Sequence, residues 1–304
     1  MAHLFSPLTL GGRELPNRIA MSLARSGFSI GGGFVSEEMC EYYARRARGG
    51  VGLIISEPFL VCSPAERQGG HLGAYADAFV PALHRLTDAV HVHGASFLLT
   101  LDAPPDHDAS SAPVVRALRE AFLQAAWRSL SAGCDGIVLN AAPGSALHTL
   151  ISPRMQVLAE RRDNGLRLAI EIVETTRRWL GKRFIVGVRL PAEELTTGGL
   201  TLQDTRVLAK RLVAAGVTLI DATVEADESL AIARFPGWCV PLANGIKRVL
   251  PDVPIACAGD LGEPLLADSV VRDSSIDLVL LDQHLHLNPD WVQHAYAILY
   301  PKGA

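Results

Sequence analysis

The chain has 304 residues, of which 49% are hydrophobic and 20% charged, with a formal net charge of -4 and five cysteines. This composition argues against nucleic acid or an anionic membrane as a partner, and no apolar run approaches the roughly 20 residues that cross a bilayer. The odd number of cysteines and the lack of a CxxC pair argue against a disulfide framework or a zinc knuckle. With no signal peptide visible, we expect a cytoplasmic protein that binds a small molecule.

Short apolar runs recur along the whole chain and predict eight strands. They are continuous rather than alternating, which is typical of parallel strands covered on both faces. In chain order the predicted strands span residues 18–22, 51–56, 96–101, 136–140, 184–190, 218–223, 254–259 and 277–282.

Helical patterns separate most of these strands, and each of five ends on a glycine. They span residues 36–50, 78–94, 112–133, 166–181 and 201–216, the first with Ser36 as its N-cap. Eight strand-and-helix units predict an α/β fold, a single-domain (β/α)8 TIM barrel over residues 1–304, since such a barrel needs about 250 residues. The alternative, a doubly wound open sheet, usually has a GxGxxG turn after its first strand, and this chain has none there.

Segments spread over nearly the whole chain resemble the old yellow enzyme family of FMN-dependent ene-reductases. They include LFSPLTLGGRELPNRIAMS near the start, EYYARRARGGVGLIISE after it, and NPDWVQHA near the end. The resemblance implies a TIM barrel with FMN at its mouth, in agreement with the strand pattern. It also implies that Arg189, on the fifth strand, corresponds to the family's flavin-facing arginine.

The positions that carry the family's chemistry differ in this sequence. The family's paired histidine or asparagine side chains and its proton-donating tyrosine correspond here to Asn140, Pro143 and Ser145. Pro143 has no donor, and the Ser145 hydroxyl is a poor substitute for a phenol. The family's other flavin contacts correspond to Thr100 on strand three, Asp102 and Ala103 after it, and Leu23, Ala24 and Arg25 after strand one.

The phosphate contacts of the family are replaced by acids. A Gly-Arg pair after strand eight corresponds to Asp282 and Gln283, and the second of two glycines after strand seven to Asp260. Two unit charges about 4 Å apart at an effective dielectric near 20 interact by about 4 kcal/mol, so exchanging attraction for repulsion is a large effect. The sequence therefore predicts a barrel without bound FMN.

These replacements favour a flavin-independent, non-redox enzyme that isomerises, cyclises or rearranges an apolar small molecule, as in natural-product biosynthesis. Arg189, His148 and Asn140 are the predicted catalytic residues, and no metal is expected. The predicted substrate-binding residues are Leu23, Arg25, Glu57, Thr100, Asp102, Pro143, Ser145, Asp221, Trp238, Asp260 and Asp282. The alternatives are a divergent FMN- and NAD(P)H-dependent ene-reductase and a non-catalytic partner or ligand-binding protein, each compatible with a homodimer.

Several of these residues also have a structural interpretation. Arg189 needs a partner if it is buried, and Glu57 or Asp221 at neighbouring strand ends would form an ion pair with it. Asp282 and Asp102 are candidates for capping the turns that follow them, and a lone helical histidine such as His148 often serves in packing. The i, i+2 spacing of two further histidines, His284 and His286, argues against a metal site.

Overall fold

The computed structural model describes residues 3–22, 27–63, 70–104, 111–155, 159–226 and 235–301. For 159–164 and 225–226 it describes the backbone alone. Leu23 and Arg25, both predicted to bind substrate, lie outside the described residues. Within these ranges, no helix has both the length and the apolar character needed to cross a bilayer.

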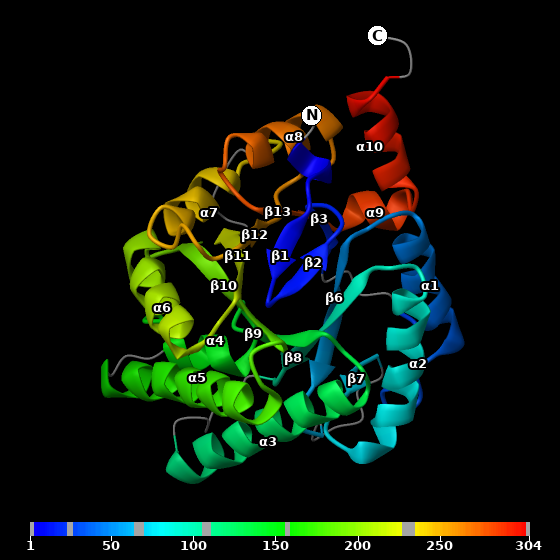
Figure 1. Ribbon diagram of the computed structural model, residues 1–304. Coiled ribbons are helices and arrows are strands. Elements are labelled where there is room, and N and C mark those ends of the chain that lie inside the picture. Colours follow the sequence, from blue (N-terminus) through cyan, green and yellow to red (C-terminus); the bar gives the residue numbers. More distant parts are fainter. Residues whose placement is uncertain are drawn as a thin grey trace.

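Eight parallel strands form a closed barrel, which confirms the predicted (β/α)8 fold. The ring closes because β3 pairs with both β13 and β6. Figure 1 shows the strands in the centre with the helices around them. The barrel strands are β3 (Ile19–Met21), β6 (Leu53–Leu60), β8 (Ser96–Asp102), β9 (Gly136–Asn140), β10 (Ile185–Leu195), β11 (Leu219–Ala226), β12 (Ile255–Cys257) and β13 (Leu278–Leu281).

All five predicted helices are present, and the side chain of Ser36 accepts a hydrogen bond from the backbone N–H of Met39, as an N-cap does. Among the described residues, five further helices, α4 and α7 to α10, were not predicted. The helices are α1 (Glu37–Arg48), α2 (Val80–His91), α3 (Ala112–Ser131), α4 (Ala146–Ile151), α5 (Ala159–Leu180), α6 (Leu202–Ala215), α7 (Val240–Lys247), α8 (Pro264–Arg272), α9 (Gln283–Leu287) and α10 (Trp291–Leu299), with 3-10 turns η1 (His3–Phe5) and η2 (Asp77–Phe79).

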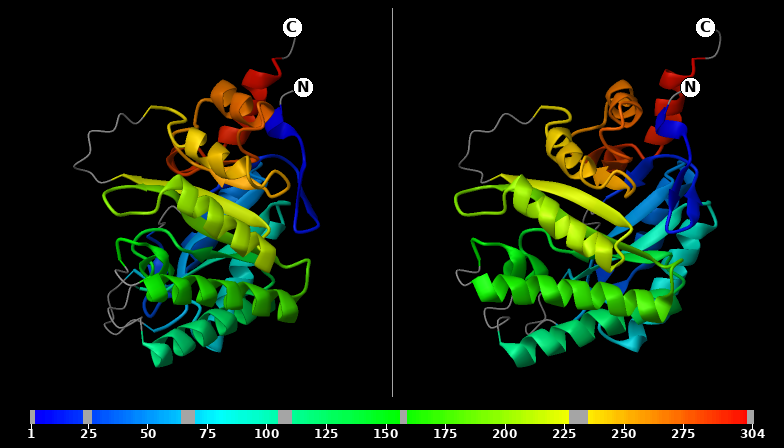
Figure 2. Two further views of the ribbon diagram at one scale, coloured as in Figure 1. Left: turned by 90° about the vertical axis from the view of Figure 1, so that its left-hand side faces the viewer. Right: turned by 60° about the vertical axis from the view of Figure 1, so that its left-hand side comes forward.

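A hairpin of β1 (Leu8–Leu10) and β2 (Arg13–Leu15) covers the amino end of the barrel. Leu10 and Leu15 are buried in one cluster with Leu53, Ile185 and Leu278, which stand in the first residues of their strands. Figure 2 shows the hairpin at one end of the molecule. With that end filled by side chains, the opposite, carboxyl end is left for ligands, as in other barrels of this kind.

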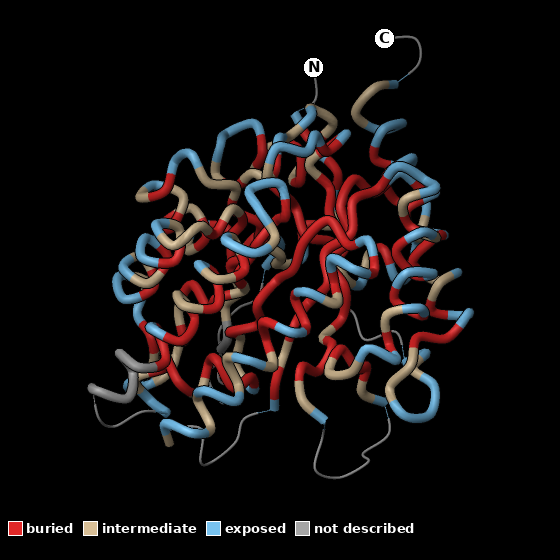
Figure 3. The backbone as a smooth tube through the Cα atoms, turned by 60° about the horizontal axis from the view of Figure 1, so that its bottom comes forward, coloured by how far each residue is buried: buried red, intermediate tan, exposed pale blue. Residues whose placement is uncertain are grey.

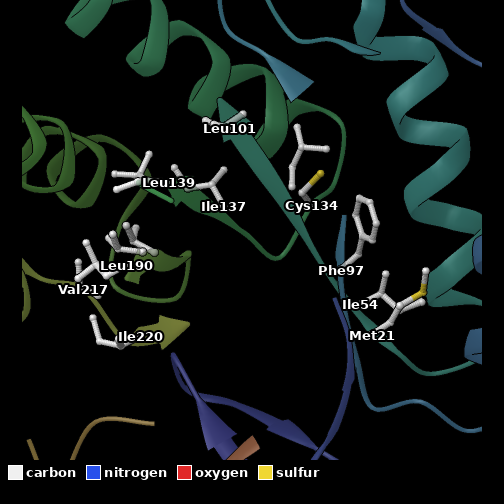
Figure 4. Close-up of a cluster of buried hydrophobic side chains, with 14 of the residues drawn as sticks. Met21, Ile54, Phe97, Leu101, Cys134, Ile137, Leu139, Leu190, Val217 and Ile220 are labelled. Carbon is white, nitrogen blue, oxygen red and sulfur yellow. The ribbon is translucent and has the colours of Figure 1, made fainter. Parts of the chain in front are cut away.

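A second core separates the strands from the surrounding helices. Ile54, Phe97, Ile137 and Ile220 belong to it, and Figure 4 shows Ile54 next to Phe97, with Ile137 and Ile220 on other strands of the barrel. In Figure 3 the buried central strands contrast with the exposed outer turns of the helices. Burying one such side chain contributes about 1.5–3 kcal/mol, so the continuous apolar strands provide a rigid frame for the residues at their ends.

Three further short strands of the described ranges lie outside the barrel. β4 (Ser29–Ile30) pairs with β5 (Phe34–Val35), and β7 (Leu72–Gly73) adds to the end of β6.

The strand β10 is longer than predicted and extends to Leu195. Its pairing with β11 continues past a register shift between Pro191 and Glu193 and brings Glu193 opposite Val224. Proline has no N–H to donate, which explains an interruption at this point. The two strands therefore project as a ribbon beyond the barrel rim.

Candidate active site

Three of the predicted residues lie side by side at the carboxyl ends of neighbouring strands. Arg189 on β10 is in register with Asn140 on β9 and with Asp221 on β11. The Nε atom of Arg189 lies 3.7 Å from Oδ2 of Asp221, whose side chain is 1% exposed. Of the two predicted partners of Arg189, the structure thus brings Asp221 into an ion pair.

This ion pair leaves hydrogen-bonding capacity unused. Nε of Arg189 and both carboxylate oxygens of Asp221 are buried and have no hydrogen-bond partner within the described structure. Burial raises the pKa of Asp221, and the nearby Arg189 only partly offsets that rise. Buried polar groups without partners are rare, so their occurrence at a barrel mouth indicates a place for a polar ligand.

The segment after β9 is held by its own side chains. Oδ1 of Asn140 accepts a hydrogen bond of 3.2 Å from the N–H of Ala142. Ser145 caps α4 by accepting from the N–H of His148 at 3.1 Å, and Pro143 lies half-buried in the turn between them. The structure therefore uses Asn140 and Ser145 to shape this loop.

His148, predicted to be catalytic, is buried against the extended part of β10. Its Nε2 atom hydrogen-bonds Oε1 of Glu194. Oε2 of Glu194 also accepts from the Ser152 hydroxyl at 2.9 Å and from the N–H of Leu200 at 2.7 Å. Burial alone would raise the pKa of Glu194, but these hydrogen bonds, with that of His148 foremost, lower it.

Glu194 was not selected from the sequence. The run VGVRLPAEE ends in two acids directly after an apolar strand, which was the signal available, and the structure buries the second of them.

Thr100 is fully buried and its hydroxyl is directed within the barrel wall. The hydroxyl donates to the carbonyl of Ser56 at 2.7 Å, and the Thr100 N–H donates to the Ser56 hydroxyl at 2.9 Å. Both bonds span a register shift between Ile55 and Pro58 on β6. Thr100 thus stabilises an irregular strand end that presents Glu57.

Two of the predicted substrate-binding acids share a cavity of about 200 Å³. Glu57 and Asp102 line it together with His71, which was not predicted. Oδ1 of Asp102 accepts from the N–H of Ala103 at 2.8 Å, which is the loop-capping contact considered for it. His71 also lines an adjoining groove of about 760 Å³ whose walls include Phe34 and Tyr75.

An acid follows each of the last two barrel strands. Asp260, after β12, has a left-handed backbone (φ 55°), and its Oδ1 lies 2.9 Å from Nε2 of His284. Asp282 occupies the N-cap position of α9 but makes no side-chain capping bond, contrary to the capping role considered for it. Burial raises its pKa, an effect partly offset by Arg189 and His286.

The remaining aromatic and histidine candidates also have defined places. Trp238 is half-buried in the segment between β11 and α7 and packs against the main core. His286 lies 2.8 Å from the hydroxyl of Tyr42, so His284 and His286 have different partners. The described ranges contain no group of three or more His, Cys, Asp or Glu side chains suited to a metal ion.

The sequence matches a known enzyme family over most of its length. The sequence model of the NADH:flavin oxidoreductase / NADH oxidase family matches residues 3–111 and 106–300. The NADPH dehydrogenase of Listeria monocytogenes serotype 4a (strain HCC23) is 31% identical, over 97% of this chain and 94% of that protein. The NADH oxidase of Thermoanaerobacter brockii is 27% identical over 96% of this chain, which spans 50% of that protein.

Solved structures support the same fold. An old yellow enzyme homologue from Zymomonas mobilis superposes with a TM-score of 0.82 at 22% identity, covering 98% of this chain and 93% of that one. A 2-naphthoyl-CoA reductase superposes with a TM-score of 0.89 at 21% identity, covering 96% of this chain and 51% of that one.

These matches correct two predictions. The expected flavin-independent isomerase or cyclase is wrong, and so is the expectation of no cofactor, because the matching family and the named relatives are flavin or NAD(P)H oxidoreductases. They support the prediction that the chain is an enzyme. Side-chain replacements misled the prediction because backbone N–H groups, which every replacement except proline keeps, also bind phosphates and polar rings.

The described residues fit the isoalloxazine ring of a flavin better than its phosphate group. The buried, partnerless atoms of Arg189 and Asp221 suit the polar edge of an isoalloxazine ring. TIM barrels frequently bind phosphate at the loops after strands seven and eight and at a short extra helix. In this chain Asp260 and Asp282 stand there, and their charge does not fit a phosphate group.

Proposed function

The chain belongs to the NADH:flavin oxidoreductase / NADH oxidase family, and from this premise we propose that it is a flavin-dependent NAD(P)H oxidoreductase that reduces an activated carbon–carbon double bond. The Listeria relative supports this proposal because the match extends over nearly all of both chains. A bound flavin would supply hydride transfer between NAD(P)H and the substrate, chemistry that side chains alone do not provide.

The observation that carries the proposal is the Arg189–Asp221 pair at the barrel mouth. Arg189 would offer a fixed positive charge to a bound flavin ring, which needs such stabilisation as it gains electrons, and Asp221 holds the guanidinium in its place. Because the barrel wall is rigid, this charge is positioned before any ligand arrives.

A proton must also reach the substrate to complete a reduction. Pro143 and Ser145 stand where the resemblance implies the proton-donating region, and neither is suited to that role. His71 lines both the 200 Å³ cavity and the aromatic groove beside it, so we assign it as the proton donor. The groove, with Phe34, Tyr75 and Phe79 in its walls, would receive an apolar substrate.

The test is NAD(P)H oxidation by the purified protein supplemented with flavin, with an activated alkene as electron acceptor. We expect turnover by the wild type, a loss of at least about tenfold in Arg189→Met, and no change in Arg183→Met, a matched change at an exposed arginine before β10. Absence of flavin-dependent oxidation in the wild type would refute the proposal. A flavin bound without any turnover would indicate a binding protein instead.

A further inference from the structure

The carboxyl ends of β12 and β13 are adjacent, and α9 follows β13 directly (Figure 1). In TIM barrels this corner is a frequent phosphate site. Here Asp260 follows β12 and Asp282 precedes α9, so two carboxylates stand at the corner. Asp260 comes shortly after the end of β12 and its side chain is 58% exposed, whereas Asp282 directly follows β13.

The cationic side chains near this corner already have partners. His284 is paired with Asp260 through the 2.9 Å contact. Arg46, which is 3% exposed, donates to the carbonyls of Leu285 and His286 at 3.1 Å each and to that of Tyr42 at 2.7 Å. Its guanidinium carbon also lies 3.3 Å from the centre of the Tyr42 ring. Arg46 therefore links α9 to α1 by hydrogen bonds and is not available to a ligand.

Asp282 has no close counterion among the described residues. None of the ion pairs formed among the described residues includes it, and it makes no capping hydrogen bond. Asp221 lies on β11, which pairs with β12, so the Arg189–Asp221 pair and this corner lie on neighbouring strands at the same rim of the barrel. The partnerless atoms of Arg189 and Asp221 indicate independently that the site takes a polar ligand.

We propose that this barrel takes a flavin without a terminal phosphate, riboflavin or a similarly uncharged isoalloxazine, in preference to FMN. The inference rests on the proposed flavin-dependent function. An uncharged ribityl chain can donate its hydroxyl hydrogens to Asp260 and Asp282, since carboxylates accept hydrogen bonds. A phosphate dianion at the same place has no such hydrogens to offer and is repelled by both acids.

The test is a titration of the purified chain at pH 8 with riboflavin and with FMN, followed by the quenching of flavin fluorescence. We expect riboflavin to bind about tenfold more tightly than FMN, with added salt weakening the discrimination because it screens the repulsion. The substitutions Asp260→Asn and Asp282→Asn, alone and together, should raise FMN affinity by about tenfold and change riboflavin affinity much less. Asparagine is well tolerated in the left-handed backbone of residue 260.

The matched control is Asp252→Asn, which removes the same charge at an exposed position before β12, at the other end of the strand. It should leave the ratio of the two affinities unchanged. Tighter binding of FMN by the wild type, unaltered by the substitutions at 260 and 282, would overturn the inference and leave the proposed function standing. Failure of both flavins to bind would overturn the proposed function, and this inference with it.

Discussion

The imidazole Nε2 of His148 hydrogen-bonds Oε1 of Glu194, and this contact joins α4 to the part of β10 that projects beyond the barrel. The same carboxylate accepts hydrogen bonds from the Ser152 hydroxyl and the Leu200 N–H. The α4 segment and the loop after β10 therefore meet on one buried acid. The contact explains why a polar sequence such as Pro-Ala-Glu-Glu continues a strand.

Glu194→Gln should lower the free energy of unfolding at pH 7 by about 2–3 kcal/mol, because it removes the charge that strengthens these buried hydrogen bonds. Denaturant titration measures the loss. Glu193→Gln, one residue earlier on a half-buried position, is the matched control and should stay within about 0.5 kcal/mol. Equal losses in the two variants would contradict the assigned role of Glu194.

The pH dependence of that loss follows from the lowered pKa of Glu194. An acid with a lowered folded-state pKa stabilises the fold above its unfolded pKa, which is about 4.3 for glutamate, and this contribution is lost as the pH falls through the folded-state value. The difference between the wild type and Glu194→Gln should therefore shrink when unfolding is measured below about pH 4. A difference that is constant with pH would show that the charge of Glu194 is not involved.

Arg189→Met should destabilise the fold by about 3 kcal/mol, since it leaves Asp221 buried without a counter-charge. The pKa of Asp221 is already raised by burial, and removal of Arg189 would raise it further. A raised carboxyl pKa favours the folded state at low pH, so the loss should be greater at pH 8 than at pH 5. The double variant with Asp221→Asn should recover part of the stability; no recovery would contradict the pairing.

The barrel could be predicted from the sequence because its strands are continuous apolar runs. The run at 136–140 matches β9 at both ends, whereas the run at 184–190 stops before Glu193 and Glu194, since charged residues are not typical of a strand. The pairing that carries β10 onward depends on β11 and on His148, which are distant in the sequence. The β1–β2 hairpin was not predicted, although Gly11-Gly12 between two short apolar segments is a hairpin signal.

The candidate site was partly predictable because the barrel itself was predictable. Closing a parallel barrel sets Arg189 beside Asp221, because equivalent strand ends meet at one rim. The partners of His148 and Thr100 could not be derived in this way, since both depend on irregular strand ends. His71 was missed because it lies in the segment between β6 and β7, which has no periodic pattern.

Thr100→Val should cost about 1–2 kcal/mol, because the valine removes the hydroxyl that donates to the Ser56 carbonyl while keeping the shape of the side chain. Thr9→Val on the exposed face of β1 is the control and should change stability by less than about 0.5 kcal/mol. Thermal and denaturant unfolding of the three proteins measure the difference. Equal stability of Thr100→Val and the wild type would show that the strand irregularity is maintained without this bond.

Gly11 and Gly12 form the turn of the β1–β2 hairpin and both have positive φ angles, +60° and +82°. A Cβ atom on Gly11 would lie 2.6 Å from Cγ1 of Ile185, whereas one on Gly12 would meet no atom within 4 Å. Gly12→Ala should therefore cost only the left-handed backbone strain, about 1–2 kcal/mol, and Gly11→Ala should cost more because Ile185 must also move at the amino end of the barrel. Denaturant unfolding compares the two variants directly. Equal stability of Gly11→Ala and Gly12→Ala would mean that the hairpin is not in tight contact with Ile185 of β10. The amino end of the barrel would then be less closely packed than the structure indicates.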